Sequence, residues 1–125
     1  LGIINNFYNL KLYDSSIYYS QKLLRIDKIS YNIKNKANLL IAKSFIENDQ
    51  NNNGIDYLLT TINLVKDESG AEAQYLLAKI FYDKSQLNQS LETLYLLNVN
   101  PKKCLSLAIA VVNTIWFGFT DLSIV

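Results

Sequence analysis

The residue types that most enzymes use for acid–base chemistry are scarce in this chain. It contains no histidine and a single cysteine, Cys104, so neither a histidine-based catalytic triad nor an imidazole metal ligand can be built from it. Lys102 and Lys103 precede Cys104, and their charges would favour a thiolate, but we interpret this cysteine as a small apolar residue at a packed position. A glycine-rich phosphate-binding loop is also missing from the sequence. We therefore expect a protein that is not an enzyme and carries no cofactor.

One segment has the spacing of a calcium ligand set. Residues 49–54, Asp-Gln-Asn-Asn-Asn-Gly, place oxygen-bearing side chains at alternate positions before a glycine, as the first half of an EF-hand loop does. That loop requires a bidentate glutamate six residues after the glycine, and Thr60 stands there instead. We interpret the segment as a polar turn between two helices and expect no metal site.

Composition indicates a folded chain without a nucleic-acid partner. Of 125 residues, 50% are hydrophobic and 18% are charged, which suits a packed domain rather than a disordered segment. The net charge of +1, with both signs interspersed, argues against a clustered basic face. A single thiol permits no intrachain disulfide, so the cytoplasm and a bacterial envelope both remain open as compartments. Because the chain has no methionine, we expect a fragment of a longer protein, and the sequence does not indicate its oligomeric state.

A five-residue pattern occurs three times along the chain. Each copy has an aliphatic residue, a small or aliphatic residue, a phenylalanine, a small residue and another aliphatic residue, always at the same spacing within the copy. The copies are offset by 38 and then 36 residues, which is the size of one helical-hairpin repeat. The copies are Ile3, Ile4, Phe7, Ser16 and Ile17; Ile41, Ala42, Phe45, Gly54 and Ile55; and Leu77, Ala78, Phe81, Ser90 and Leu91.

The small residues of this pattern predict where helices touch. Packed helices lie roughly 8–10 Å apart, and Ala42 facing Gly54, or Ala78 facing Ser90, would allow the closest approach. Phe45 lies one turn after Ala42 on the same face, where it would fill the space between one hairpin and the next. Such a hairpin cannot bury both of its faces alone, so hairpins stack. The sequence thus predicts an all-α fold of antiparallel helical hairpins.

Apolar periodicity and capping residues place the individual helices. We expect a first helix that ends near Leu10, with Asp14, Ser15 and Ser16 as caps of the second. Gly70 resembles the glycine that stops a helix, and Pro101 suits the first turn of another. The remaining helices are predicted over residues 17–25, 33–47, 54–65, 71–83 and 88–98.

These residues resemble the tetratricopeptide repeat family. That family places a small residue and an aromatic on its first helix, as Ala78 and Phe81 do here, and a second small residue twelve positions after the first, as Ser90 does. It often closes with a proline, as Pro101 does. The resemblance implies a right-handed α-solenoid with repeat 1 at residues 1–30, truncated at its start, repeat 2 at 31–68, repeat 3 at 69–101, and an apolar segment at 102–125.

The resemblance also implies a binding surface. In such arrays the first helices of successive repeats line a concave face that holds a protein or peptide partner. Lys43 and Lys79 are 36 residues apart and would form a column of cations on that face, unless they only solvate the outer sides of their helices. Carried over by position, the candidate partner-binding residues are Tyr8, Asn9, Lys36, Lys43, Ile46, Tyr75, Lys79 and Tyr82, with Asn5, Leu39 and Glu72 beside them.

Residues 105–125 differ from the rest, since Asp121 is their only charge. Three interpretations remain open. The segment could be the first helix of a further repeat or a capping helix, because Thr114 and Phe117 fall on the small and aromatic positions of the pattern. It could be a membrane span, since about 20 apolar residues suffice to cross a bilayer. It could also be a non-native tail.

The sequence therefore predicts a non-catalytic scaffold that binds a protein or peptide partner and no nucleic acid. The alternative is a membrane-tethered structural subunit of an envelope assembly, with residues 105–125 as its anchor.

Overall fold

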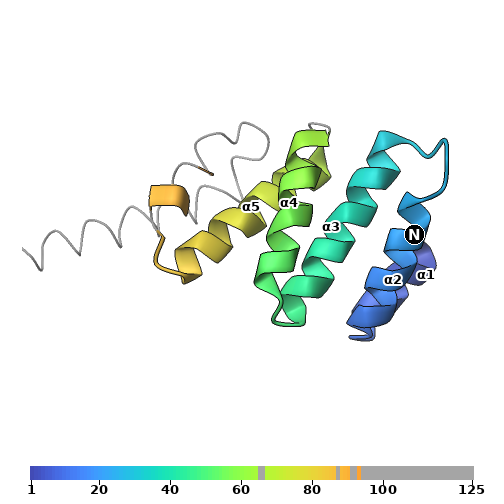
Figure 1. The fold of residues 1–125 in the computed structure, drawn as a ribbon, viewed down its shortest axis with the longest axis horizontal. Coiled ribbons are helices and arrows are strands. Elements are labelled where there is room, and N and C mark those ends of the chain that lie inside the picture. Colours follow the sequence, from blue (N-terminus) through green and yellow to red (C-terminus); the bar gives the residue numbers. More distant parts are fainter. Residues whose placement is uncertain (65–66, 87, 91–92, 94–125) are drawn as a thin grey trace, which may run out of the picture. The chain divides into compact units, whose positions relative to one another are not determined.

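The computed structural model describes residues 1–64, 67–86, 88–90 and 93, and the regular structure within them is helical. This confirms the predicted all-α class. The expectations for residues 105–125, for Cys104 and for Pro101 lie outside the described residues. The helices whose bounds are defined are α1 (Gly2–Asn9), α2 (Tyr13–Leu24), α3 (Tyr31–Glu47), α4 (Asn51–Leu64) and α5 (Glu68–Asp83) (Figure 1), and residues 88–90 are also helical.

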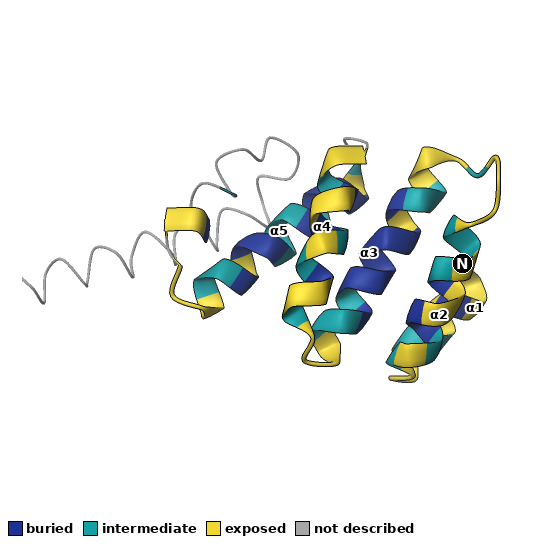
Figure 2. Ribbon diagram, in the orientation of Figure 1, coloured by how far each residue is buried: buried dark blue, intermediate teal, exposed yellow. Residues whose placement is uncertain are grey.

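Helices that follow one another in the first part of the chain pack side by side. The pairs α1–α2 and α3–α4 are antiparallel hairpins, and α2 packs on α3 (Figure 1). The chain divides into two compact units, Leu1–Ala73 and Gln74–Val125, so α5 begins in the first unit and continues into the second. Helix α3 is the most buried element (Figure 2), with Ile41 and Ala42 fully enclosed.

The same turn ends the first helix of each hairpin. Lys11, Asp49 and Ser85 have left-handed backbone, with φ of 62°, 59° and 60°. They are separated by the same 38 and 36 residues as the sequence pattern. This is the Schellman arrangement, in which the amide after the left-handed residue reaches back to a carbonyl of the last helical turn. The amides of Leu12, Gln50 and Gln86 donate to the carbonyls of Phe7, Phe45 and Phe81 at 2.9, 2.8 and 2.8 Å.

Both predicted contacts between small residues are confirmed. A Cβ added to Gly54 would lie 3.1 Å from the carbonyl oxygen of Ala42 and 3.0 Å from Cγ1 of Ile46, so α3 and α4 approach as closely as a glycine permits. The hydroxyl of Ser90 donates to the carbonyl of Ala78 at 2.7 Å. These contacts explain why the fourth position of the pattern is always a small residue: Ser16, Gly54 or Ser90.

Several predicted helix boundaries were wrong, because serine and aspartate side chains serve as caps at some positions and are buried between helices at others. Helix α2 begins at Tyr13, before the expected caps, and its N-cap Leu12 has no side-chain bond. Ser16 is instead fully buried, with its hydroxyl 3.2 Å from that of Ser44. Helix α3 begins at Tyr31, because the hydroxyl of Ser30 accepts from the amide of Ile33 at 3.3 Å.

Helices α4 and α5 both begin earlier than predicted, so part of the polar run before Gly54 is helical and Gly70 does not end a helix. Residues 51–54 of the calcium-like segment belong to the first turn of α4, whereas Asp49 and Gln50 form the turn before that helix. Gly70 lies inside the first turn of α5, and its amide donates to Oδ1 of Asp67 at 2.9 Å. Asp67 therefore caps a helix that starts three residues earlier than predicted.

Among the described residues no helix is long and apolar enough to cross a membrane.

Candidate functional site

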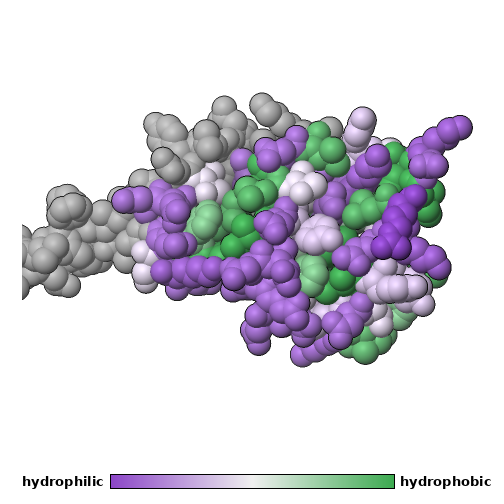
Figure 3. Space-filling model, viewed as in Figure 1, coloured by the Kyte–Doolittle hydropathy of each residue, from purple (hydrophilic) through white to green (hydrophobic). Residues whose placement is uncertain are grey.

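A groove of about 260 Å³ lies on the first unit, and the residues around it come from α1 with its N-cap Leu1, from α3 and from the start of α5. The side chains of Leu39 and Leu40, which are 7% and 5% exposed, provide an apolar wall. Lys36, Lys43, Glu68 and Glu72 provide charge of both signs. In the view of Figure 3 the hydrophobic residues of the described helices likewise form separate patches among hydrophilic ones. The lining residues are Leu1, Asn5, Lys36, Leu39, Leu40, Lys43, Glu68, Ser69 and Glu72.

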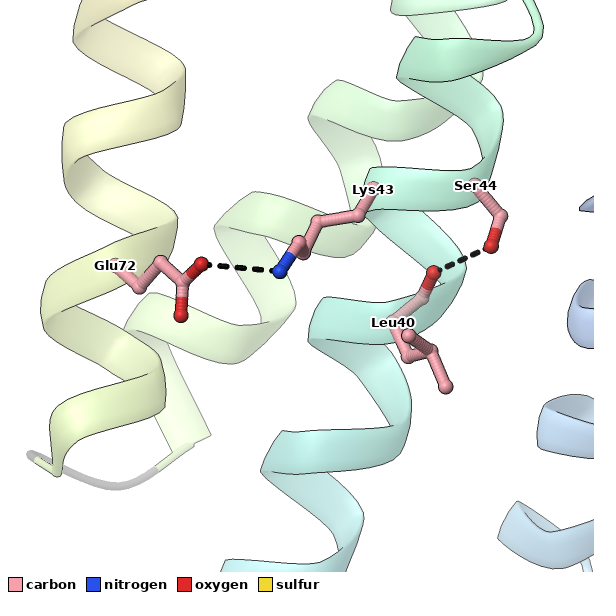
Figure 4. Close-up of polar contacts among 4 residues, drawn as sticks. All are labelled: Leu40, Lys43, Ser44 and Glu72. Atoms are coloured by element: carbon pink, nitrogen blue, oxygen red, sulfur yellow. Dashed lines mark hydrogen bonds and ion pairs between the residues drawn. The ribbon is translucent and has the colours of Figure 1, made fainter. Parts of the chain in front are cut away.

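Lys43 links three helices at this groove. Its Nζ lies 3.1 Å from Oε1 of Glu72 on α5 (Figure 4) and 5.4 Å from the centre of the Tyr8 ring on α1. The two charged side chains are 30% and 34% exposed, so water still reaches the pair. Tyr8 and Lys43, both predicted site residues, are thus brought together. The positive charge of Lys43 is thus paired with Glu72 at the groove.

The environment of Tyr8 favours its neutral phenol. Burial raises the pKa of Tyr8 above its ordinary 10.0, and the negative charge of Glu47, with smaller contributions from Tyr13 and Glu72, raises this pKa further. The ring of Tyr8 also lies 5.7 Å from that of Tyr13, which anchors it between α1 and α2. Tyr8 is therefore a hydrogen-bonding and aromatic surface rather than an anion at neutral pH.

Buried polar contacts hold α3 in place beneath the groove. Nδ2 of Asn35, a fully buried residue, donates to Oδ1 of Asp67 at 3.1 Å, so the cap of α5 is also its tie to α3. On the opposite side, the hydroxyl of Ser44 donates to the carbonyl of Leu40 at 2.8 Å (Figure 4) and meets Ser16 of α2. The first bond joins α3 to the start of α5 beside the groove, and the contact with Ser16 joins α3 to α2 behind it.

Of the other predicted site residues, some line the groove and some lie elsewhere. Lys36 is exposed and lines the groove, and Asn9 is exposed at the end of α1. Ile46 is half-buried, and its side chain packs toward Gly54 rather than into the groove. In the second unit Lys79 is exposed, while Tyr75 and Tyr82 are half-buried.

Sequence reasoning missed the polar residues that position the groove. Asn35 was overlooked because an asparagine within an amphipathic helix gives no periodic signal. Asp67 could have been found, since an acidic residue directly before a helical pattern is a common N-cap. The partner of Lys43 lies 29 residues away, a spacing that only the packed structure defines.

The described residues contain no group of three or more histidine, cysteine, aspartate or glutamate side chains that could hold a metal ion. No protein family model matches this chain, and no curated protein is significantly similar to it.

Proposed function

We propose that this chain is an array of tetratricopeptide-type repeats, a right-handed α-solenoid, that binds a protein or peptide segment on the face formed by its first helices. The proposal includes no catalytic step. It is supported by the recurrence of one hairpin design: the same left-handed turn at Lys11, Asp49 and Ser85, at the offsets of the sequence pattern. Repetition of this kind is typical of solenoids, which present extended binding surfaces.

The observation that carries the binding proposal is the composition of the groove. Its lining comes from α1, α3 and α5, the first helix of each hairpin, and none of these residues belongs to α2 or α4. Binding in such arrays uses this set of helices, so the groove lies where the proposal requires it.

The chemistry of the groove suits a peptide segment. Leu39 and Leu40 offer apolar contact, and Asn5 offers an amide that both donates and accepts. Lys36 and Glu68 form no ion pair within the described part of the chain, so they remain available for opposite charges on a partner. A mixture of apolar contact and a few polar groups is typical of sites that select a specific ligand.

Site-specific photo-crosslinking in the source cells tests this function. A photoreactive amino acid at Asn5 or Lys36 in the full-length protein should crosslink to one defined partner, identified by mass spectrometry. The matched control is the same amino acid at Lys22, which is exposed on α2 and lies outside the groove.

A second arm uses charge. Lys36→Glu should reduce the yield of the crosslink formed from Asn5, while the helical circular dichroism stays unchanged. Crosslinks that form from Lys22 but not from either groove position would contradict the proposal.

A further inference from the structure

The connector between α2 and α3 concentrates positive charge. Although the whole chain has a net charge of only +1, residues 22–34 hold four of its 12 lysines and arginines and one of its 11 acids, Asp27. Helices α2 and α3 pack side by side, so the last turn of α2 and the first turn of α3 meet at the same end of the pair (Figure 1). We call this surface the basic edge, and it consists of Lys22, Arg25, Ile26, Lys28, Tyr31 and Lys34.

The cations of the basic edge are available to an outside partner. Lys22, Arg25 and Lys28 are exposed, and within the described part of the chain none of them forms an ion pair. Lys34 likewise has no acidic partner there; its Nζ lies 5.4 Å from the centre of the Tyr31 ring, which leaves its positive charge uncompensated. Four neighbouring like charges repel one another, so an anion that covers them is favoured.

The fold does not require these cations. A cation in the last turn of a helix complements the helix dipole, which suits Lys22, but the equivalent residue of α4, 38 positions on, is Thr60. In the same way Arg25 corresponds to the neutral Asn63. Lys34 lies in the first turn of α3, where the dipole disfavours positive charge. The charge of the basic edge therefore has no evident use within the hairpin itself.

Packing of one hairpin on another leaves this surface open. The second hairpin already has the first packed against it through α2 and α3, so it shows which positions such packing buries. Arg25 corresponds to Asn63 of the second hairpin, which is exposed. Ile26 corresponds to Leu64, which is 36% exposed. The exposure of the basic edge is therefore a property of the hairpin and not of its position along the chain.

Two apolar side chains stand among the cations and indicate the kind of anion. Ile26 is 53% exposed and Tyr31 is 60% exposed. A surface that rests on a lipid bilayer combines apolar groups, which enter the boundary between headgroups and acyl chains, with lysine and arginine that attract anionic headgroups. Tyrosine suits that boundary because its ring is apolar and its tip polar. A soluble acidic partner would pair with the cations but would offer no apolar layer to Ile26 and Tyr31.

We propose that the basic edge binds the surface of a bilayer that contains anionic lipids. The cations contact the headgroup phosphates, and Ile26 and Tyr31 lie at the level of the headgroups. Each lysine or arginine near such a surface strengthens binding by about fivefold. This surface is distinct from the groove, because none of its six residues lines the groove.

Vesicle co-sedimentation of the 125-residue chain tests the proposal. The chain should bind vesicles made of equal parts phosphatidylglycerol and phosphatidylcholine, and added salt should weaken this binding because it screens the charges. Vesicles of phosphatidylcholine alone should bind far less. An apolar segment such as residues 105–125 would bind both kinds of vesicle, so the preference for the anionic vesicles separates the basic edge from it.

Substitutions within the basic edge give the size of the effect. Arg25→Gln combined with Lys28→Gln should lower the affinity for the anionic vesicles by about twentyfold or more. Ile26→Ser should lower it by about fivefold, because less apolar surface enters the headgroup layer. These side chains are exposed, so the helical circular dichroism should not change.

The matched control is Lys11→Gln, which removes a charge from an exposed residue at the opposite end of α2. Lys11 and Lys28 have the same left-handed backbone, with φ of 62° and 65°, and the control should bind the vesicles nearly like the parent chain. Equal binding to the two kinds of vesicle, or equal affinities of the control and the Arg25 Lys28 variant, would overturn the proposal. Binding to soluble polyglutamate without binding to anionic vesicles would overturn it in favour of an acidic protein partner. None of these outcomes bears on partner binding in the groove, which the crosslinking experiment tests independently.

Discussion

The ion pair of Lys43 and Glu72 sets how the groove would recognise charge in the binding role that we propose. Both side chains are about one-third exposed, and an exposed ion pair of this kind contributes about 0–1 kcal/mol. A carboxylate on a bound partner can therefore compete with Glu72 for Lys43 at little cost. The face of the Tyr8 ring holds Lys43 near the groove in either arrangement.

The raised pKa of Tyr8 makes the free energy of unfolding depend on pH in the alkaline range. Its folded-state pKa is raised above 10.0 by burial and by Glu47, so the unfolded chain releases the phenolic proton at a lower pH than the folded chain does. The stability that this neutral phenol contributes is fully present below pH 10 and is lost as pH rises through the raised pKa. We expect Tyr8→Phe to remove that part of the alkaline loss while keeping the ring beneath Lys43. Urea denaturation between pH 9 and pH 11 measures it.

The control for this measurement is Tyr18→Phe, which removes a phenol that is 60% exposed. Its free energy of unfolding should follow the parent curve over the same pH range. If the Tyr8→Phe and parent curves were parallel, the phenol of Tyr8 would have the same proton affinity in the folded and unfolded chain.

At the scale of the elements, Gly54 sets the separation of α3 and α4. Because a Cβ there would already press on the backbone oxygen of Ala42 at 3.1 Å, the larger side chain of Gly54→Val must push the helices apart. We expect the free energy of unfolding to fall by about 1–3 kcal/mol, as measured by urea denaturation. Asn53→Val, at the exposed neighbouring position, should change it far less, and equal losses would show that the close contact does not limit the packing.

The turn at Lys11 stores strain that glycine would relieve. An L-residue with left-handed backbone costs roughly 1–2 kcal/mol, whereas glycine adopts this conformation freely but loses about 0.5–1 kcal/mol of backbone entropy on folding. Lys11→Gly should therefore stabilise the chain by about 0.5–1 kcal/mol, seen as a higher melting temperature. Lys22→Gly, inside α2, should lower it instead. A decrease for both would mean that the turn at Lys11 is not left-handed in solution.

The sequence predicted the contacts between helices, because small residues are required at them. It predicted helix starts less well, because the same polar residues occur both as caps and elsewhere in helices. Small residues at Ala42, Gly54 and Ser90 are needed only where helices touch, so their spacing predicted the contacts. Helix starts were less predictable, because asparagine, aspartate and serine occur both as caps and within first turns. Ser16 shows the ambiguity: its hydroxyl is suited to a cap, but it is buried between helices.

On the scale of the whole molecule, the sequence pattern indicated which helices lie around the groove, but it did not indicate how their side chains pair. Position within the recurring sequence pattern was enough to predict that Asn5, Lys36 and Lys43 lie on one side of the helices, and all three line the groove. The pairing of Lys43 with Glu72, and of Asn35 with Asp67, depends on the exact rotation of each helix. Such rotations follow from the packing of many side chains at once, which a periodic pattern does not specify.

Burial also varies strongly from helix to helix in the first unit, and hydrogen exchange should follow it. Eight residues of α3 are buried, from Asn35 to Ser44, whereas Ile4 is the one buried residue of α1. Local opening is easiest where few buried contacts are lost. We expect the amides of α3 to exchange most slowly in this unit and those of α1 most rapidly, as measured by mass spectrometry at low protein concentration.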